Sequence, residues 1–110
     1  MDIVTLAADA NLNELRRQLN NNKDLKMVDV YWTALGGIPS VFINISLDDR
    51  DTWANGIFQN SRYSQFVIHN DMKLEQMSLH YKLVKHRKCK IKGVNDLVSR
   101  IAKWANNNSQ

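Results

Sequence analysis

The sequence predicts a single α+β domain over residues 1–110, with an N-terminal helix, a four- to five-stranded and mostly antiparallel sheet, and a C-terminal helix. Three observations predict it. Apolar residues recur at helical spacing near both ends of the chain. Between them lie β-branched and aromatic runs separated by glycine, proline and asparagine. A chain of 110 residues also buries one core without disulfides or a metal.

The first helix is predicted at about 12–21, because three leucines recur there at helical spacing, namely Leu12, Leu15 and Leu19. Asn11 followed three positions later by Glu14 has the pattern of a capping box. The preceding residues, 2–8, fit either a helical turn or a short strand, and their alanines favour the helix.

Two strands are predicted next, over residues 27–35 and 40–47. Gly36, Gly37, Ile38 and Pro39 separate them, which indicates a hairpin. Every second residue of the later run is apolar, so one face of that strand is predicted to enter the core: Val41, Ile43, Ile45 and Leu47.

Residues 48–62 show neither period, and we interpret them as a long surface excursion. Its apolar residues are predicted to fold it back onto the domain: Trp53, Ile57 and Phe58. Loops of this length are uncommon inside compact domains and are often functional.

Strand character returns at 63–69, and Asn70 with Asp71 predicts a turn into a partner strand at 72–83. Residues 81–92 are predicted to form two strands with a bend near 84–87. If this stretch is extended, its even positions form an almost wholly cationic face: Lys82, Val84, His86, Lys88, Lys90 and Lys92.

A C-terminal helix is predicted over 94–106, with both helices on one face of the sheet. This segment has the strongest helical period in the chain, formed by Val94, Leu97, Val98, Ile101, Trp104 and Ala105. Trp104 completes the stripe, which favours a place in the core.

Positive charge is concentrated in one place, residues 80–92, which we call the basic segment. It contains six lysines and arginines, two of the three histidines and no carboxylate. Residues 1–79 carry seven basic and ten acidic side chains, so without this segment the chain is mildly acidic. Like charges repel, and such a concentration indicates a surface that meets something anionic.

The leading hypothesis for function is therefore a small non-enzymatic module that docks on nucleic acid or a nucleoprotein complex. Tyr63 and Tyr81 are expected to supply stacking planes. The competing interpretation is a solvated edge strand that lysines protect from aggregation. The expected contacts are Lys82, Lys85, Arg87, Lys88, Lys90, Lys92 and Arg62.

The second hypothesis is an inhibitor of the kind found in phages and mobile elements, which binds and blocks a host protein. The residues expected to contact the host protein are the large apolar and aromatic residues in and next to the excursion: Trp53, Ile57, Phe58 and Tyr63. An alternative for Trp53 is that it only pins the loop to the domain.

Catalytic and metal chemistry find little support, and no cofactor is expected. His80, His86 and Cys89 match no standard metal spacing, and the surrounding cations oppose a divalent ion. The carboxylates that would suit magnesium are neighbours in one stretch, interrupted by Arg50: Asp48, Asp49 and Asp51. Cys89 is expected to be a small buried hydrophobe.

No apolar run approaches a membrane span, and a cytoplasmic location is expected. The sequence does not predict an oligomeric state, and a dimer that pairs through edge strands is among the alternatives.

Overall fold

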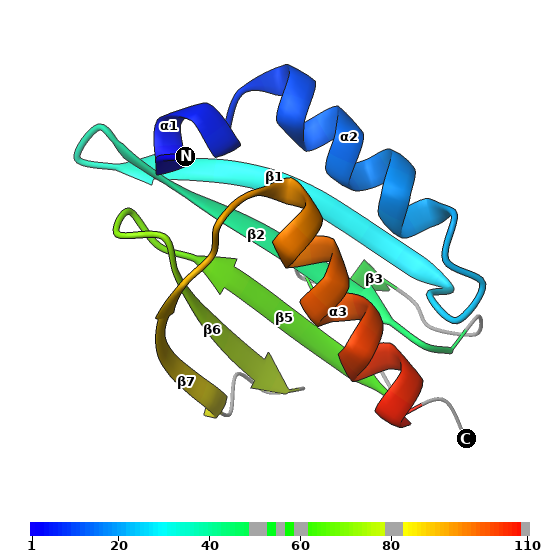
Figure 1. Cartoon of the computed structure of the whole chain (residues 1–110). Helices are drawn as coiled ribbons and strands as arrows, with labels where there is room; N and C mark the ends of the chain where they lie inside the picture. The colour runs from blue at the N-terminus through cyan, green and yellow to red at the C-terminus, as the bar shows by residue number, and fades with distance from the viewer. Residues whose placement is uncertain (49–52, 55–56, 59–61, 79–82, 109–110) are drawn as a thin grey trace.

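The computed structural model describes residues 1–48, 53–54, 57–58, 62–78 and 83–108, and these form an α+β fold (Figure 1). The helices are α1 (Ile3–Leu6), α2 (Asp9–Asn20) and α3 (Val94–Asn108). The main strands are β1 (Met27–Leu35), β2 (Ile38–Ser46), β5 (Tyr63–Ile68), β6 (Lys73–Ser78) and β7 (Leu83–Lys90). A short separate pair comprises β3 (Trp53–Ala54) and β4 (Ile57–Phe58).

The described part of the main sheet has five strands in the order β1-β2-β5-β6-β7, and every neighbouring pair is antiparallel. This confirms the predicted fold class. In the described ranges, no helix combines the length and apolar character that crossing a bilayer requires.

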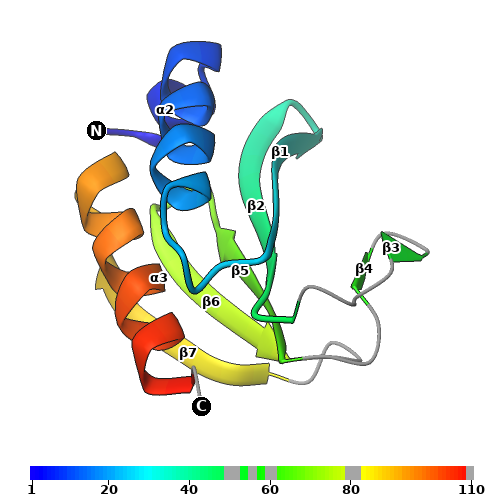
Figure 2. The ribbon, with the colours of Figure 1, turned by 90° about the vertical axis from the view of Figure 1, so that its right-hand side faces the viewer.

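All three helices cover one face of the sheet, as predicted, and the β3–β4 pair lies on the other side (Figure 2). The apolar face of β2 enters the core, because Val41, Ile43 and Ile45 are fully buried. The stripe of α3 packs against the same core through Val94, Leu97, Ile101 and Ala105. Burying one such aliphatic side chain contributes about 1.5–3 kcal/mol, so this interface holds α3 in place.

The helix favoured for residues 2–8 is confirmed as α1, whereas the second helix begins earlier than predicted. Residues 3–6 form α1, and the Asp2 carboxylate caps it by accepting from the backbone N–H of Thr5 at 2.8 Å. The second helix begins at Asp9, so the predicted start at 12 is wrong. Asn11 is not its cap: the amide Nδ2 of Asn11 donates to the carbonyl of Thr5 at 2.7 Å and thereby ties α2 to α1.

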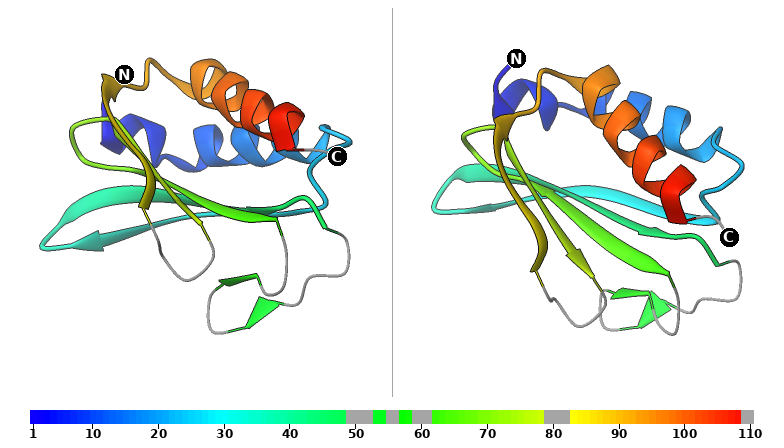
Figure 3. Two further views of the ribbon diagram at one scale, coloured as in Figure 1. Left: turned by 90° about the horizontal axis from the view of Figure 1, so that it is seen from below. Right: turned by 60° about the horizontal axis from the view of Figure 1, so that its bottom comes forward.

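The first hairpin has a tighter turn than predicted. Gly36 and Gly37 both have positive φ, 68° and 84°, so they alone make the connection, and β2 already begins at Ile38. Two successive residues with positive φ are typical of a two-residue type I′ turn, whose twist matches that of the strands. The hairpin extends well beyond the rest of the sheet (Figure 3, left).

The later strands differ from the prediction in where they end. β6 stops at Ser78 and β7 begins at Leu83, so the strand expected over 72–83 is shorter. The predicted break near 84–87 is replaced by irregular pairing inside one strand, β7. The helix predicted at 94–106 is confirmed and continues to Asn108. Its first turn is fixed by Asp96, whose carboxylate accepts from the backbone N–H of Lys92 at 2.9 Å.

Candidate nucleic-acid interface

Most of the basic segment lies in β7, an edge strand of the sheet. Within the described ranges, β6 is the only strand that pairs with it. Lys85, Arg87 and Lys88 occupy this strand, where the structure describes the backbone alone. Lys90 ends the strand and Lys92 follows it, and both are exposed. Lys82 and Tyr81 lie outside the described residues.

The pairing of β7 with β6 is irregular. His86 pairs with Glu75 and Lys90 pairs with Lys73, so four steps along β7 match two steps along β6. A second shift lies between the pairs made by Gln76 and Met77. Extra residues of this kind interrupt the regular alternation of a strand. These shifts interrupt the regular backbone alternation on which a single cationic face over the even positions would depend.

Two lysines face each other across the two strands. Lys73 and Lys90 are register partners, and like charges directly opposite each other destabilise a sheet. Asp71 compensates only partly, because its Oδ2 lies 3.9 Å from the Nζ of Lys73 and both side chains are more than 40% exposed. The nearby carboxylate of Glu75 lies 3.3 Å from Nε2 of His69, without hydrogen-bond geometry. An anion between Lys73 and Lys90 would relieve their repulsion.

A groove of about 260 Å³ runs between α3 and the sheet. Leu74 lines it and alternates with Lys73 along β6, so the groove opens on the face of the sheet opposite to Lys73 and its register partner Lys90. Its sheet wall is formed by Phe66, Leu74 and Gln76, and its helix wall by Ser99, Arg100, Lys103, Trp104, Asn107 and Asn108. The β7 neighbour of Gln76 is Lys85, so the groove adjoins the basic strand.

The groove combines cations, amides and an aromatic ring. Trp104 is partly buried and meets Phe66 edge to face, with ring centroids 5.5 Å apart and planes at 77°, so the core role predicted for it is confirmed. Nε of Arg100 donates to Asp96 at 3.2 Å, whereas Lys103 is exposed. Arg100 and Lys103 were not predicted as site residues, although their spacing of three places them on one face of α3.

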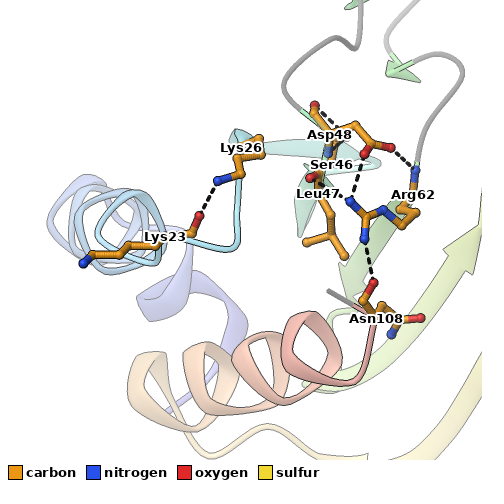
Figure 4. A network of polar contacts seen from close by, with 7 residues as sticks. All are labelled: Lys23, Lys26, Ser46, Leu47, Asp48, Arg62 and Asn108. Carbon is orange, nitrogen blue, oxygen red and sulfur yellow. Dashed lines mark hydrogen bonds and ion pairs between the residues drawn. The ribbon is translucent and has the colours of Figure 1, made fainter. Parts of the chain in front are cut away.

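Arg62 makes several contacts within the chain (Figure 4), while its predicted contact with a partner stays a prediction. Its Nη1 donates to the carbonyl of Asn108 at 2.9 Å, which caps the C-terminus of α3. Its Nη2 donates to Asp48 Oδ1 at 3.0 Å and lies 3.4 Å from the carbonyl of Leu47. The guanidinium therefore joins the two ends of the excursion to α3, and we do not carry Arg62 into the binding site.

The Asp48 carboxylate is held by the same network. The backbone N–H of Arg62 donates to its Oδ2 at 2.9 Å and, together with the guanidinium, lowers the pKa of Asp48 below its usual value. The other two carboxylates weighed for magnesium, Asp49 and Asp51, lie outside the described residues. The described ranges contain no group of three or more His, Cys, Asp and Glu side chains placed to hold a metal ion.

Tyr63 is buried within the sheet face opposite the helices. It is only 5% exposed, and its hydroxyl donates to Asn44 Oδ1 at 2.9 Å. The amide of Gln65 donates to the same oxygen at 2.8 Å. This corrects the expectation that the Tyr63 ring offers a stacking plane or a protein contact, because a ring engaged in this way has no free face.

The remaining residues of the second hypothesis lie in the β3–β4 pair. Trp53 pairs with Phe58, and Ala54 with Ile57, in backbone register. β4 lies against β2, on the side away from the helices (Figure 3). This fits an excursion that folds back onto the domain, while the contact role of Trp53, Ile57 and Phe58 remains a prediction.

Comparison with known proteins identifies no relative: no family model, no curated protein and no solved structure matches this chain. Function has to be inferred from the side chains themselves.

Proposed function

We propose that the edge of the sheet formed by β7 binds nucleic acid, with its neighbours on β6 and α3 completing the surface. The observation that supports this is that cations flank this edge on both faces of the sheet: Lys73 of β6 and Lys90 of β7 on one face, Arg100 and Lys103 of α3 on the other, with Lys92 after the strand. Lysine and arginine neutralise phosphates and release counterions, which provides most of the affinity of such contacts.

The groove beside α3 favours a single strand as the ligand. A single strand exposes its bases, and protein side chains bind them by stacking and by hydrogen bonds to their edges. Trp104 packs on the core and also lines the groove with its ring, and the exposed Asn107 supplies an amide that can donate and accept. Gln76 is not counted, because it is buried and its Nε2 already donates to Ser64 Oγ at 3.0 Å. Phosphates on either side of such a base would lie near Lys103 and the basic strand.

In this proposal Lys90 and Lys92 contact phosphates. By their charge, the other members of the basic segment are expected to add to the same attraction: Lys82, Lys85, Arg87 and Lys88. Their contribution is electrostatic and independent of base sequence, because phosphate contacts carry no sequence information.

The test is a fluorescence-anisotropy titration of labelled single-stranded and duplex DNA and RNA over a series of salt concentrations. The variant Lys90→Glu/Lys92→Glu reverses two exposed charges at the edge. We expect its affinity to fall and the slope of log K against log salt to decrease by about 1.4 on single strands, since each lost phosphate contact removes about 0.7.

The matched control is Lys23→Glu/Lys26→Glu. It changes the net charge by the same amount at two exposed lysines after α2. The proposal predicts that this control retains most of the affinity. An equal loss of affinity in both variants would mean that binding follows the net charge of the chain and not this edge. Absence of binding by the native chain at physiological salt would refute the proposal.

A further inference from the structure

The opposite edge of the sheet, strand β1, lacks the protection that β7 carries. From Val30 to Leu47, which covers most of β1 and all of β2, the sequence contains no charged side chain. The register of β1 with β2 shows no bulge, and β1 has no proline. Natural proteins usually blunt an edge strand with lysine, proline or a bulge, because an open edge pairs with other strands.

Two independent observations show which peptide groups of β1 point away from the sheet. Pro39 has no N–H and is the register partner of Ala34, so this pair is not one that exchanges hydrogen bonds. The carbonyl of Val30 accepts from Nη2 of Arg16 at 2.7 Å, from outside the hairpin. Alternation along the strand then directs the N–H and C=O groups of Trp32 and Ala34 outward as well.

Only the first half of this edge is covered. Arg16 reaches it from α2 and satisfies Val30. In the described part of the chain, no side-chain or loop hydrogen bond reaches the backbone of Trp32 or Ala34. The hairpin carries this open half beyond the other strands, where a second strand has room to approach (Figure 3, left).

The side chains beside the open half are apolar and exposed. Trp32 is 49% exposed on the helix-facing side, and Val4 of α1 is 66% exposed nearby. Together with Ala7 and Ala34 they line a shallow groove of about 640 Å³, in which Asp9 is the one charged residue of the described lining. Exposed apolar patches of this kind mark sites of association, and tryptophan is enriched at their centres.

We propose that β1 pairs antiparallel with β1 of a second copy of this chain, which forms a dimer with one continuous sheet. With Thr33 on the two-fold axis, Trp32 lies opposite Ala34 of the other copy, so a large side chain meets a small one on both sides of the axis. Both residues direct their peptide groups outward, as a hydrogen-bonded pair requires.

Charge favours a second copy as the occupant. An uncharged strand offers no attraction to a strongly acidic or basic partner, whereas it pairs with itself without repulsion. The dimer would hold the two basic β7 edges at its far ends, because β1 and β7 are opposite edges of the sheet. The inference does not depend on nucleic-acid binding.

The test is sedimentation equilibrium of the full chain, compared with the variant Trp32→Lys. The native chain is expected to sediment at twice its chain mass of 12.7 kDa, and the variant at the single mass. The matched control is Ile38→Lys, which adds the same charge at a residue of similar exposure, 52%, but on β2, which pairs with the side of β1 opposite to the proposed contact. Far-ultraviolet circular dichroism establishes that each variant folds.

Amide hydrogen exchange of the native chain gives a second readout without substitution. Protection of the Trp32 and Ala34 amides is expected to rise with protein concentration, while amides inside β5 stay constant. A native chain that is monomeric at high concentration would overturn the proposal. Dissociation by Ile38→Lys as complete as that by Trp32→Lys would also overturn it, because the contact would then be the apolar hairpin tip and not the strand edge.

Discussion

Replacing Arg62 with alanine removes the side chain that joins the start and the end of the excursion to the last turn of α3. Three acceptors lose the guanidinium as donor: the carbonyl oxygens of Asn108 and Leu47, and Oδ1 of Asp48. We expect the variant to fold, to be less stable, and to bind nucleic acid with nearly native affinity. The last outcome separates the structural role of Arg62 from the contact that the sequence suggested.

The size of the effect follows from exposure. Hydrogen bonds to a charged group contribute about 1.5–3 kcal/mol each when they are shielded from water. Here the side chains of Arg62 and Asp48 are 42% and 34% exposed, and exposed ion pairs contribute under about 1 kcal/mol. The bond to Asn108 is exposed as well, so we expect a total loss of about 2 kcal/mol spread over the three contacts. For a chain of this size the melting temperature would fall by roughly 8 °C.

The loss should depend on pH through Asp48. Its pKa is lowered in the folded chain, so its stabilising contribution is complete above the unfolded pKa of about 3.9 and disappears as pH falls through the folded value. The difference in stability between the native chain and the variant should therefore narrow in acid. Part of the pH dependence remains in the variant, because the backbone N–H at position 62 still donates to Asp48.

Urea unfolding followed by tryptophan fluorescence and circular dichroism measures the change. Arg17→Ala is the control, since Arg17 pairs with Glu14 inside α2 and its side chain is 61% exposed. We expect this control to change the free energy of unfolding little, because an ion pair this exposed is screened by water. The reasoning is refuted if Arg62→Ala is as stable as the control, or if its loss of nucleic-acid affinity matches that of Lys90→Glu/Lys92→Glu.

Two further outcomes test other parts of the structure. Hydrogen bonds from Arg17 and then Gln18 lower the pKa of Glu14 to about 2, so this pKa should rise in Arg17→Met. Carbon chemical shifts followed during a pH titration measure it, and an unchanged pKa would exclude Arg17 as the cause. Gly36→Ala should cost roughly 1 kcal/mol in urea unfolding, because φ is 68° while a Cβ there meets nothing within 4 Å, and a neutral result would mean that the turn changes its conformation.

Local patterns in the sequence were sufficient to predict the order and type of the main elements. The stripe from Val94 to Ala105 predicts α3 because burial at helical spacing requires nothing from the rest of the chain. The alternation from Val41 to Leu47 predicts the core face of β2 for the same reason. The start of α2 was misplaced because Asn11 bonds to Thr5 of the preceding helix, a contact that the capping pattern does not reveal.

The candidate site, like the fold, could be predicted from the sequence only in part. Charge counting along the chain identifies the basic segment, but it does not reveal that Arg100 and Lys103 of α3 lie beside the same edge. Nor does it distinguish an arginine that faces solvent from Arg62, whose partners are 14 to 46 residues away in sequence. Tyr63 was misjudged because its burial is decided by the segments packed around it, including Asn44, which lies 19 residues away and accepts from its hydroxyl.

The sequence by itself determined the class of the fold, the concentration of positive charge and the uncharged run that became the hairpin. These are properties of neighbours along the chain. Only the tertiary structure decided that the basic and the uncharged strands form opposite edges of one sheet. The reason is that strand order is set by pairing between distant segments, and pairing decides which peptide groups and side chains are left facing outward.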